Sequence, residues 1–485
     1  METTTAAILE PLELRFSDLL LLSSTAPPHS SPLAPAELSR LQSLSAAVMH
    51  ALGPSGPGLL TVTGVPRAPG LRGALLPFAR KLALLGRKDL ARVLKEHGLG
   101  SDVPIKNLDR NVSSFALQLK YTEGLVSDSS SNLTSTEENS HAEGNPVVSF
   151  ANFDAMEFKN LGHTFKELGL CMMELGLRLA QICDKATDCK ELEESIMDGS
   201  AKGRLIHYHS MLDNIIMKEA NRRRKGSKKR DGRSNFVPSP SNERLTSEEL
   251  VTKSGRETLP EQTSFTQYYP RNRDFTGRMS KTALSNLWQQ WHYDYGIFTV
   301  LTSPSFMFSC QAEGCSHISC CQECSSPDGH TYLQLLDIKK NKIYVVKTPP
   351  DSFIIQVGEA ADILTRGKLR STLHSVSRPF DTENLSREIF VVFLLPAWSK
   401  VLSYSGYPFY DESWDQDKSV VRNDISASYE KEDISFCADS HQLMQEIIAK
   451  IPPLSIRYRD GMTFAEFSRE TTKQYYSSSG TQSIR

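Results

Sequence analysis

Two histidines and one aspartate are the residues best suited to chemistry in this 485-residue sequence. His292 and Asp294 are separated by a single residue, and His374 lies further along the chain. In a strand, side chains alternate between the two faces, so His292 and Asp294 would point to the same side. Two imidazoles and one carboxylate fit one face of a non-haem Fe(II) ion and leave its other positions open for oxygen and a co-substrate. An isolated H-x-D triplet is more often a structural or surface pair than a metal site. The neighbouring residues must therefore show whether this triplet binds a metal.

The segments around these residues read as buried strands. The run Ile297–Leu301 is apolar and rich in β-branched and aromatic residues, and Leu385–Pro396 is the most strand-like stretch of the chain. A turn-rich FDTEN segment separates Leu385–Pro396 from Thr372–Pro379, which predicts a hairpin. Arg387 precedes an apolar Val/Phe segment, which is an unusual place for a charged residue, so its side chain could point into the interior. Alternatively, Arg387 pairs with Glu388. Gly296 would let backbone or substrate approach closely.

Three sequence blocks follow one another in the order found in a known family of enzymes, and a fourth, weaker block lies upstream of them. The first, H-x-D-x-G-x-x-T-x-L, is matched by His292, Asp294, Gly296, Thr299 and Leu301. The second, G-D-x(5)-T-x-G-x(3)-S-x(2)-H, is matched by Gly358, Thr365, Gly367, Ser371 and His374, with Glu359 in place of the aspartate. The third, R-x-S, keeps Arg387 but has Ile389 at the serine position. The fourth, R-x-N-Y-Y-P, keeps Arg204 and Tyr208, while Ile206, His207 and His209 replace the other three residues.

The chain therefore resembles the 2-oxoglutarate/Fe(II) oxygenases of the isopenicillin-N-synthase-like branch. The resemblance implies an α+β fold whose core is a double-stranded β-helix, or jelly roll, with buttressing helices and long disordered insertions. It also implies that His292, Asp294 and His374 hold Fe(II), and that 2-oxoglutarate binds the metal and forms a salt bridge with Arg387. Tyr208 would contact the co-substrate, although a core aromatic with a satisfied hydroxyl is the simpler interpretation.

The resemblance predicts a non-haem iron dioxygenase that hydroxylates or desaturates a small organic molecule, with dioxygen as the second substrate. Two alternatives stay open. The missing serine of R-x-S favours an oxygenase of the same fold that does not use 2-oxoglutarate. A non-catalytic scaffold would keep the barrel and work through its insertions, but it would have no physical reason to hold three polar groups facing inward.

A cysteine-rich segment interrupts the family pattern within residues 310–330. It contains five cysteines beside His317 and His330: Cys310, Cys315, Cys320, Cys321 and Cys324. Thiolates at this density could bind a structural Zn(II) ion tetrahedrally. Only Cys321-x-x-Cys324 has the spacing of a zinc knuckle, so a reduced, solvent-facing loop is the alternative.

A long insertion, residues 211–285, separates Tyr208 from His292. Its segment Lys218–Arg233 holds nine basic and two acidic residues, and like charges at this density repel one another and predict disorder. Such a run is either a merely solvated loop or a contact for a nuclear-import receptor, through Arg222–Arg230. The formal net charge of −2 and the absence of interleaved aromatic residues speak against nucleic acid as a partner.

The remaining sequence divides around these features. Residues 1–121 form the N-terminal α/β region, 122–150 a flexible loop, and 151–210 a buttressing helix with the first barrel strand. Residues 286–402 form the catalytic core, and 403–485 form C-terminal helices that resemble a lid. No apolar run approaches the length of a membrane span, and the N-terminus lacks the basic region of a signal peptide. These features predict a cytoplasmic or nuclear protein.

Overall fold

The computed structural model describes residues 7–24, 34–103, 110–121, 155–188, 190–218, 286–309, 321–379, 382, 384–404 and 434–479. Several predictions fall outside these residues: the flexible loop 122–150, the basic run Arg222–Arg230, and the cysteines Cys310, Cys315 and Cys320. Cys321 and Cys324 belong to a short strand, and Cys324 is a half-buried thiol without a disulfide. The zinc site and the import signal therefore stay predictions.

The described strands form two mixed sheets. The five-stranded sheet has the order β1 (Ala7–Leu9), β12 (Lys342–Val346), β11 (Leu333–Asp337), β14 (His374–Ser377) and β7 (Leu287–His292). The larger sheet has the order β2 (Glu13–Arg15), β3 (Leu59–Thr63), β13 (Phe353–Val357), β8 (Phe298–Thr302), β15 (Leu385–Leu395), β6 (Ser200–Tyr208), β5 (Val112–Leu119) and β4 (Gly100–Ser101). Two further strands extend it: β9 (Ser305–Ser309) pairs with β15, and β10 (Cys321–Cys324) pairs with β9.

Eight strands of these sheets are divided between the two layers. In chain order, β6, β8, β13 and β15 belong to the larger sheet, whereas β7, β11, β12 and β14 belong to the smaller one. Successive side chains of a strand face opposite sides, so each strand sends every second residue into the space between the sheets. These inward residues form an apolar cluster, which includes Ile206, Trp288, Leu301, Leu335, Ile354 and Ile389. The facing sides of the two sheets therefore enclose a largely apolar interior.

The predicted hairpin between Thr372–Pro379 and Leu385–Pro396 is wrong. The first segment contains β14, which pairs with β11 and β7 in the smaller sheet. The second is β15, which pairs with β6, β8 and β9 in the larger sheet. The connection between them crosses from one layer to the other, so Arg387 does not lie on the strand beside His374. The partners of both strands come from distant parts of the chain, which the short turn-rich segment between them does not indicate.

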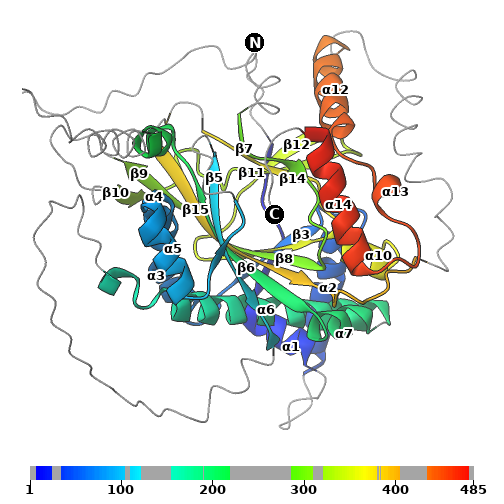
Figure 1. Ribbon diagram of the computed structural model, residues 1–485. Helices are drawn as coiled ribbons and strands as arrows, with labels where there is room; N and C mark the ends of the chain where they lie inside the picture. The colour runs from blue at the N-terminus through cyan, green and yellow to red at the C-terminus, as the bar shows by residue number, and fades with distance from the viewer. Residues whose placement is uncertain are drawn as a thin grey trace, which may run out of the picture.

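Helices cover the outer face of the larger sheet. The longest is α6 (Leu161–Thr187), which packs on β8, β15, β5 and β6 through a stripe of Leu, Phe and Met side chains (Figure 1). The other helices before β6 are α1 (Phe16–Ser23), α2 (Pro35–Leu52), α3 (Ala68–Leu75), α4 (Pro77–Leu84), α5 (Arg87–Glu96), the 3-10 turn Ala155–Phe158 and α7 (Glu191–Met197). The predicted buttressing helix is therefore present, beginning at Leu161.

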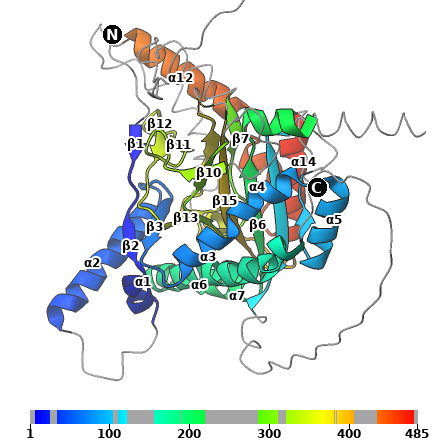
Figure 2. The same ribbon diagram turned by 90° about the vertical axis from the view of Figure 1, so that its left-hand side faces the viewer.

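The C-terminal helices are α12 (Ile434–Ala449), α13 (Leu454–Arg457) and α14 (Phe464–Ser479). In α12, Met444 and Ile447 pack with Leu287, Trp291 and Leu336 on the outer side of the smaller sheet. Figure 2 shows the strands lying between α6 and α12. Helix α12 therefore supports the smaller sheet from outside, as α6 supports the larger one. That the C-terminal helices form a lid stays a prediction. Among the described helices, none has the length and apolar character needed to cross a membrane.

Residues 211–218, which fall within the segment predicted to be disordered, form a helix. Ser210 and Asp213 form a reciprocal cap at its start. The Asp213 backbone N–H donates to Ser210 Oγ over 3.0 Å, and the Ser210 backbone N–H donates to Asp213 Oδ2 over 2.9 Å. Such a cap satisfies donors that the first turn of a helix leaves open. The boundary at 211 is therefore wrong, and residues 219–285 lie outside the described residues.

Gly296 sits where the backbone comes too close for a side chain. A Cβ atom at this position would lie 2.7 Å from the carbonyl oxygen of Leu394 and 3.0 Å from Leu395 Cδ2. We expect Gly296→Ala to destabilise the fold by about 1–3 kcal/mol, the usual cost of overpacking. Urea denaturation would measure this loss. Gly73→Ala is the matched control, since a Cβ atom there meets nothing within 4 Å, and in helix α3 it should gain about 0.5–1 kcal/mol. Equal midpoints for the two variants would contradict the prediction.

Candidate metal centre

The structure brings His292, Asp294 and His374 together. One donor atom from each lies within 4.8 Å of the others. Asp294 Oδ1 is 3.6 Å from His292 Nε2, and Asp294 Oδ2 is 3.8 Å from His374 Nε2. The two imidazole centroids are 4.2 Å apart, because His292 and His374 are direct partners in the pairing of β7 with β14. Metal–ligand bonds of roughly 2.0–2.2 Å would fit between atoms spaced in this way.

Each of the three side chains is held by its surroundings. His292 Nδ1 is 2.8 Å from the carbonyl oxygen of Gln290, and His374 Nδ1 is 3.0 Å from that of Thr372. A carbonyl only accepts, so both Nδ1 atoms carry the proton and both Nε2 lone pairs face the site. The hydroxyl of Thr299 donates to Asp294 Oδ2 over 2.6 Å. The donor set and its orientation therefore fit a divalent first-row metal such as Fe(II).

Burial and charge set the protonation of two of these groups. Burial, reinforced by His292, lowers the pKa of His374 to about 4. Burial alone would raise the pKa of Asp294, but His374, His292 and the Thr299 hydroxyl together hold it below its usual range. At neutral pH the His374 imidazole is neutral and the Asp294 carboxyl is ionised. These are the forms that bind a metal ion, because ligands must be deprotonated.

The block that precedes His374 forms the turn between β13 and β14. It contains α10 (Glu359–Leu364), in which Asp362 Oδ2 accepts hydrogen bonds from the backbone N–H and the hydroxyl of Ser371, both at 3.0 Å. Thr365 Oγ1 donates to the Ala361 carbonyl over 2.7 Å and accepts from the Leu369 N–H over 3.1 Å. The motif thus serves as a scaffold that fixes where β14 begins, and with it His374.

Asp362 should make the stability of the fold depend on pH. Burial raises the pKa of this carboxyl to about 6, against the hydrogen bonds from Ser371. The folded chain therefore binds more protons than the unfolded chain between about pH 4 and pH 6, so stability falls as the pH rises through this window. Asp362→Asn keeps a side-chain oxygen that accepts from Ser371. It should reduce the loss of unfolding free energy between about pH 4 and pH 7 by about 2 kcal/mol. Urea midpoints of the metal-free proteins at about pH 4 and pH 7 would show it, and identical pH slopes would contradict it.

Arg387 and Tyr208 lie together in the interior between the sheets. They are direct partners in the pairing of β15 with β6, and the guanidinium carbon of Arg387 is 5.1 Å from the centroid of the Tyr208 ring. Arg387 is 2% exposed; its Nε donates to the carbonyl of Thr331 over 3.1 Å, and its Nη1 has no hydrogen-bond partner among the described residues. Burial lowers the pKa of Arg387, because burying the charged guanidinium costs free energy. A bound anion would offset this cost.

The alternative pairing of Arg387 with Glu388 is not made. Glu388 is on the opposite face of β15, where its Oε1 lies 2.8 Å from His207 Nδ1 and 2.8 Å from the Ser386 hydroxyl. Ile389, at the position of the missing serine, belongs to the apolar interior cluster and offers no hydrogen bond. Because side chains alternate between the two faces of β15, Arg387 points into the interior beside apolar neighbours. The apolar residues that follow it in the sequence indicated this orientation.

A set of C-terminal contacts that hold the H-x-D segment had no signal in the sequence. The guanidinium of Arg457 binds both carboxylate oxygens of Glu359, at 2.5 and 2.7 Å, and both residues are buried. The backbone N–H of Glu359 donates to the carbonyl of Asp294 over 2.8 Å. The hydroxyl of Tyr475 accepts from the backbone N–H of Tyr293 over 3.2 Å. Residues of α13 and α14 thus fix the backbone on both sides of Asp294.

Comparisons with solved structures give several oxygenases of remote similarity. The chain matches a full-length Neurospora crassa protein in complex with alpha-KG and 5-formyluracil, with 11% identity over 98% of this chain and 99% of that chain, at a TM-score of 0.43. It matches a dioxygenase for auxin oxidation from rice with 15% identity over 82% and 87% of the two chains, at a TM-score of 0.42. It matches a putative 2OG-Fe(II) oxygenase family protein from Caulobacter crescentus with 12% identity over 92% and 100%, at a TM-score of 0.41.

These likenesses are too remote to assign an activity, so the chemistry of the site rests on the chain's own residues. No family model matches the sequence, and no curated protein matches it. The resemblance to the isopenicillin-N-synthase-like branch therefore stays a prediction.

Proposed function

We propose that this protein is an Fe(II)- and 2-oxoglutarate-dependent oxygenase, and that its eight core strands form a double-stranded β-helix. One observation carries the proposal. A triad of His292, Asp294 and His374 shares the space between the two sheets with Arg387, a buried guanidinium whose Nη1 lacks a partner among the described residues. The triad suits a non-haem iron, and the arginine suits the distal carboxylate of a co-substrate.

The charges of these groups support a dianionic co-substrate. Asp294 carries one negative charge, a bound Fe(II) ion two positive charges, and Arg387 one positive charge, which leaves a surplus of two. The two carboxylates of 2-oxoglutarate supply two negative charges. A buried site favours a ligand that cancels its charge, because an uncompensated charge in a dry interior is costly.

Each residue then has a stated task. His292 Nε2, His374 Nε2 and Asp294 would hold Fe(II), which when bound supplies the activation of dioxygen. Arg387 binds the distal carboxylate of 2-oxoglutarate with its unpaired N–H groups. Tyr208 packs against the guanidinium and fixes its direction. The apolar residues of the interior, among them Trp288 and Ile389, exclude water from the reacting atoms.

The organic substrate is proposed to be a small molecule with an oxidisable C–H bond. An oxygenase that does not use 2-oxoglutarate is the second candidate, and Ile389 in place of the motif serine is the observation that favours it. A non-catalytic scaffold is the third, but the oriented lone pairs of His292 and His374 count against it.

Uncoupled turnover would test the proposal without a known substrate. Purified protein is supplied with Fe(II), 2-oxoglutarate and oxygen, and succinate is measured over time. We expect slow succinate formation that requires iron and is lost in His292→Ala. The same measurement on Glu191→Gln, on the outer helix α7, is the control and should show no change. Bound iron without succinate would favour the second candidate, and a folded protein that binds no iron would favour the scaffold.

A further inference from the structure

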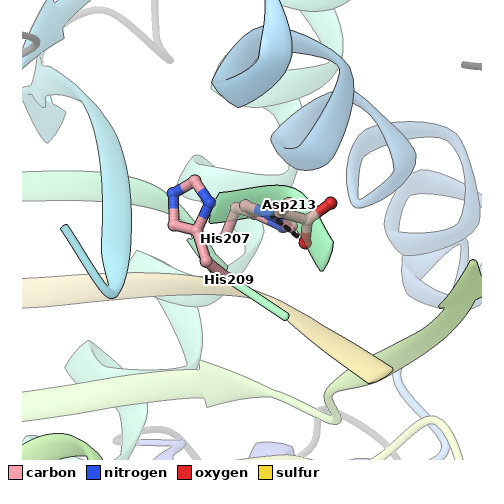
Figure 3. A group of neighbouring side chains, drawn as sticks. All are labelled: His207, His209 and Asp213. Carbon is pink, nitrogen blue, oxygen red and sulfur yellow. Dashed lines mark ion pairs between the residues drawn. The ribbon is translucent and has the colours of Figure 1, made fainter. Parts of the chain in front are cut away.

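A second group of metal-binding side chains lies on the outer face of the larger sheet. His207 and His209 flank Tyr208 at the end of β6, so alternation turns them away from the interior that Tyr208 faces. Asp213, in the helix that follows, completes the group, which Figure 3 shows gathered at this end of the strand. All three side chains are fully buried.

Two nitrogen atoms of this group are without a hydrogen bond. His207 Nε2 and His209 Nδ1 are buried and have no hydrogen-bond partner in the part of the chain that the structure describes. His207 Nε2 also lies 3.3 Å from Asp213 Oδ2, an ion pair that Figure 3 marks with a dashed line. One donor atom from each of the three residues lies within 4.8 Å of the others. In a tetrahedral site with bonds of about 2.0–2.1 Å, adjacent donors are about 3.3–3.4 Å apart.

Hydrogen bonds already hold all three side chains in place. His207 Nδ1 is 2.8 Å from Glu388 Oε1, and His209 Nε2 is 2.8 Å from the hydroxyl of Ser113. Asp213 Oδ1 accepts from Arg80 Nη2 over 2.8 Å and from Arg80 Nε over 3.1 Å. Asp213 Oδ2, the oxygen nearer His207, accepts from the backbone N–H of Ser210 over 2.9 Å and from the Ser210 hydroxyl over 2.7 Å, so a bound cation would share this oxygen with Ser210. A carboxylate behind a histidine, and hydrogen bonds that fix each ligand, are what surround metal sites in proteins.

We propose that His207, His209 and Asp213 bind a structural divalent cation of the Zn(II) type, separate from the iron centre. Two neutral nitrogens and one carboxylate suit this ion. The ion would tie the end of β6 to the helix at 211–218, and through Glu388 to β15. The inward neighbours of these residues are Tyr208 and Arg387, so the cation would fix, from the outer face, the strand ends that carry the proposed co-substrate contacts.

The competing structure is an ion network without a metal. In it, a protonated His207 lies between Asp213 and Glu388, and Arg80 balances the remaining charge. This arrangement needs no cation and has no affinity for one, so direct metal binding distinguishes the two.

The test uses the full chain with its iron site removed by Asp294→Ala. Metal-free protein is titrated with Co(II), whose visible absorption is intense in tetrahedral sites, and then with Zn(II). We expect one equivalent of Co(II) bound at micromolar concentration or below, displacement by Zn(II), and a Zn(II)-dependent rise in Tm. In the same background, His209→Gln should weaken Co(II) binding by at least about 100-fold. His163→Gln, whose side chain is 76% exposed, is the matched control and should leave it unchanged.

Folded Asp294→Ala protein that binds Co(II) and Zn(II) only at millimolar concentration would overturn the proposal and establish the ion network. So would a folded His209→Gln variant that binds as tightly as its parent. If either substitution prevents folding, the metal content of an otherwise unaltered protein with serine at the five cysteines of residues 310–324 decides, because this variant lacks the possible cysteine site. Two tightly held divalent ions per chain support the second site, and one ion, lost together with His374→Ala, rules it out.

Discussion

Replacing His374 by alanine should abolish the retention of Fe(II) by the folded protein and, with it, the formation of succinate. The imidazole is one of three donors, and its loss leaves Asp294 and His292 to hold the ion alone. Substitutions of residues that only support a ligand typically cost about 10–100-fold in metal affinity, so loss of the ligand itself should exceed about 100-fold. Metal content after desalting, together with a circular dichroism spectrum, would measure both iron and fold.

A graded control is available beside this residue. The side-chain amide of Gln356 lies 2.6 Å from His374 Nδ1; turned so that its oxygen faces the ring, the amide accepts from the Nδ1–H group and helps to position the imidazole. Gln356→Leu should therefore weaken Fe(II) binding by about 10–100-fold without abolishing it. Iron retained by His374→Ala at the level of the unaltered protein would show that the three side chains are not a metal centre.

Replacing Arg387 by glutamine should raise the concentration of 2-oxoglutarate needed for half-maximal turnover by about 10–150-fold. A hydrogen bond to a charged group contributes about 1.5–3 kcal/mol, and each 1.4 kcal/mol is about a factor of ten. Iron retention should not change, because the guanidinium contacts Thr331 and Tyr208 rather than the triad. The Tm of the ligand-free variant should stay the same or rise, since a buried and incompletely paired charge is removed.

Arg178→Gln is the control for this variant. Arg178 lies on the outer helix α6 and pairs with Glu174 over 2.6 Å, so its loss should leave the dependence on 2-oxoglutarate unchanged. An unaltered requirement in Arg387→Gln would mean that the co-substrate carboxylate binds elsewhere, or that another electron source is used.

The spacing of His292 and Asp294 was enough to place two residues of the candidate centre on one face, whereas His374 was added by the family resemblance. Side chains alternate between the two faces of a strand, so the spacing of His292 and Asp294 places both on one face. The same alternation directs Arg387 into the interior. The residue order of a strand therefore predicts the contents of the interior, provided that the strand itself is recognised.

Choice of strand partner was not predictable in this way. Residues 372–379 and 385–396 are neighbours in sequence, yet each pairs with strands from distant parts of the chain, because burial of the whole sheet decides the order. The contact of Arg457 with Glu359 joins residues far apart and leaves no local signal. The helix at 211–218 did have a sequence signal, since Ser210-x-x-Asp213 has the spacing of a reciprocal cap. This signal was missed because the basic segment that follows led to a prediction of disorder for the whole insertion.

The contacts of Tyr475 and Arg457 have a consequence for the order of biosynthesis. Both residues are translated after every strand of the two sheets, so a nascent chain on the ribosome can hold His292, Asp294 and His374 while the backbone around Asp294 is not yet fixed. The backbone around Asp294 can therefore reach its final arrangement only after α13 and α14 have been translated.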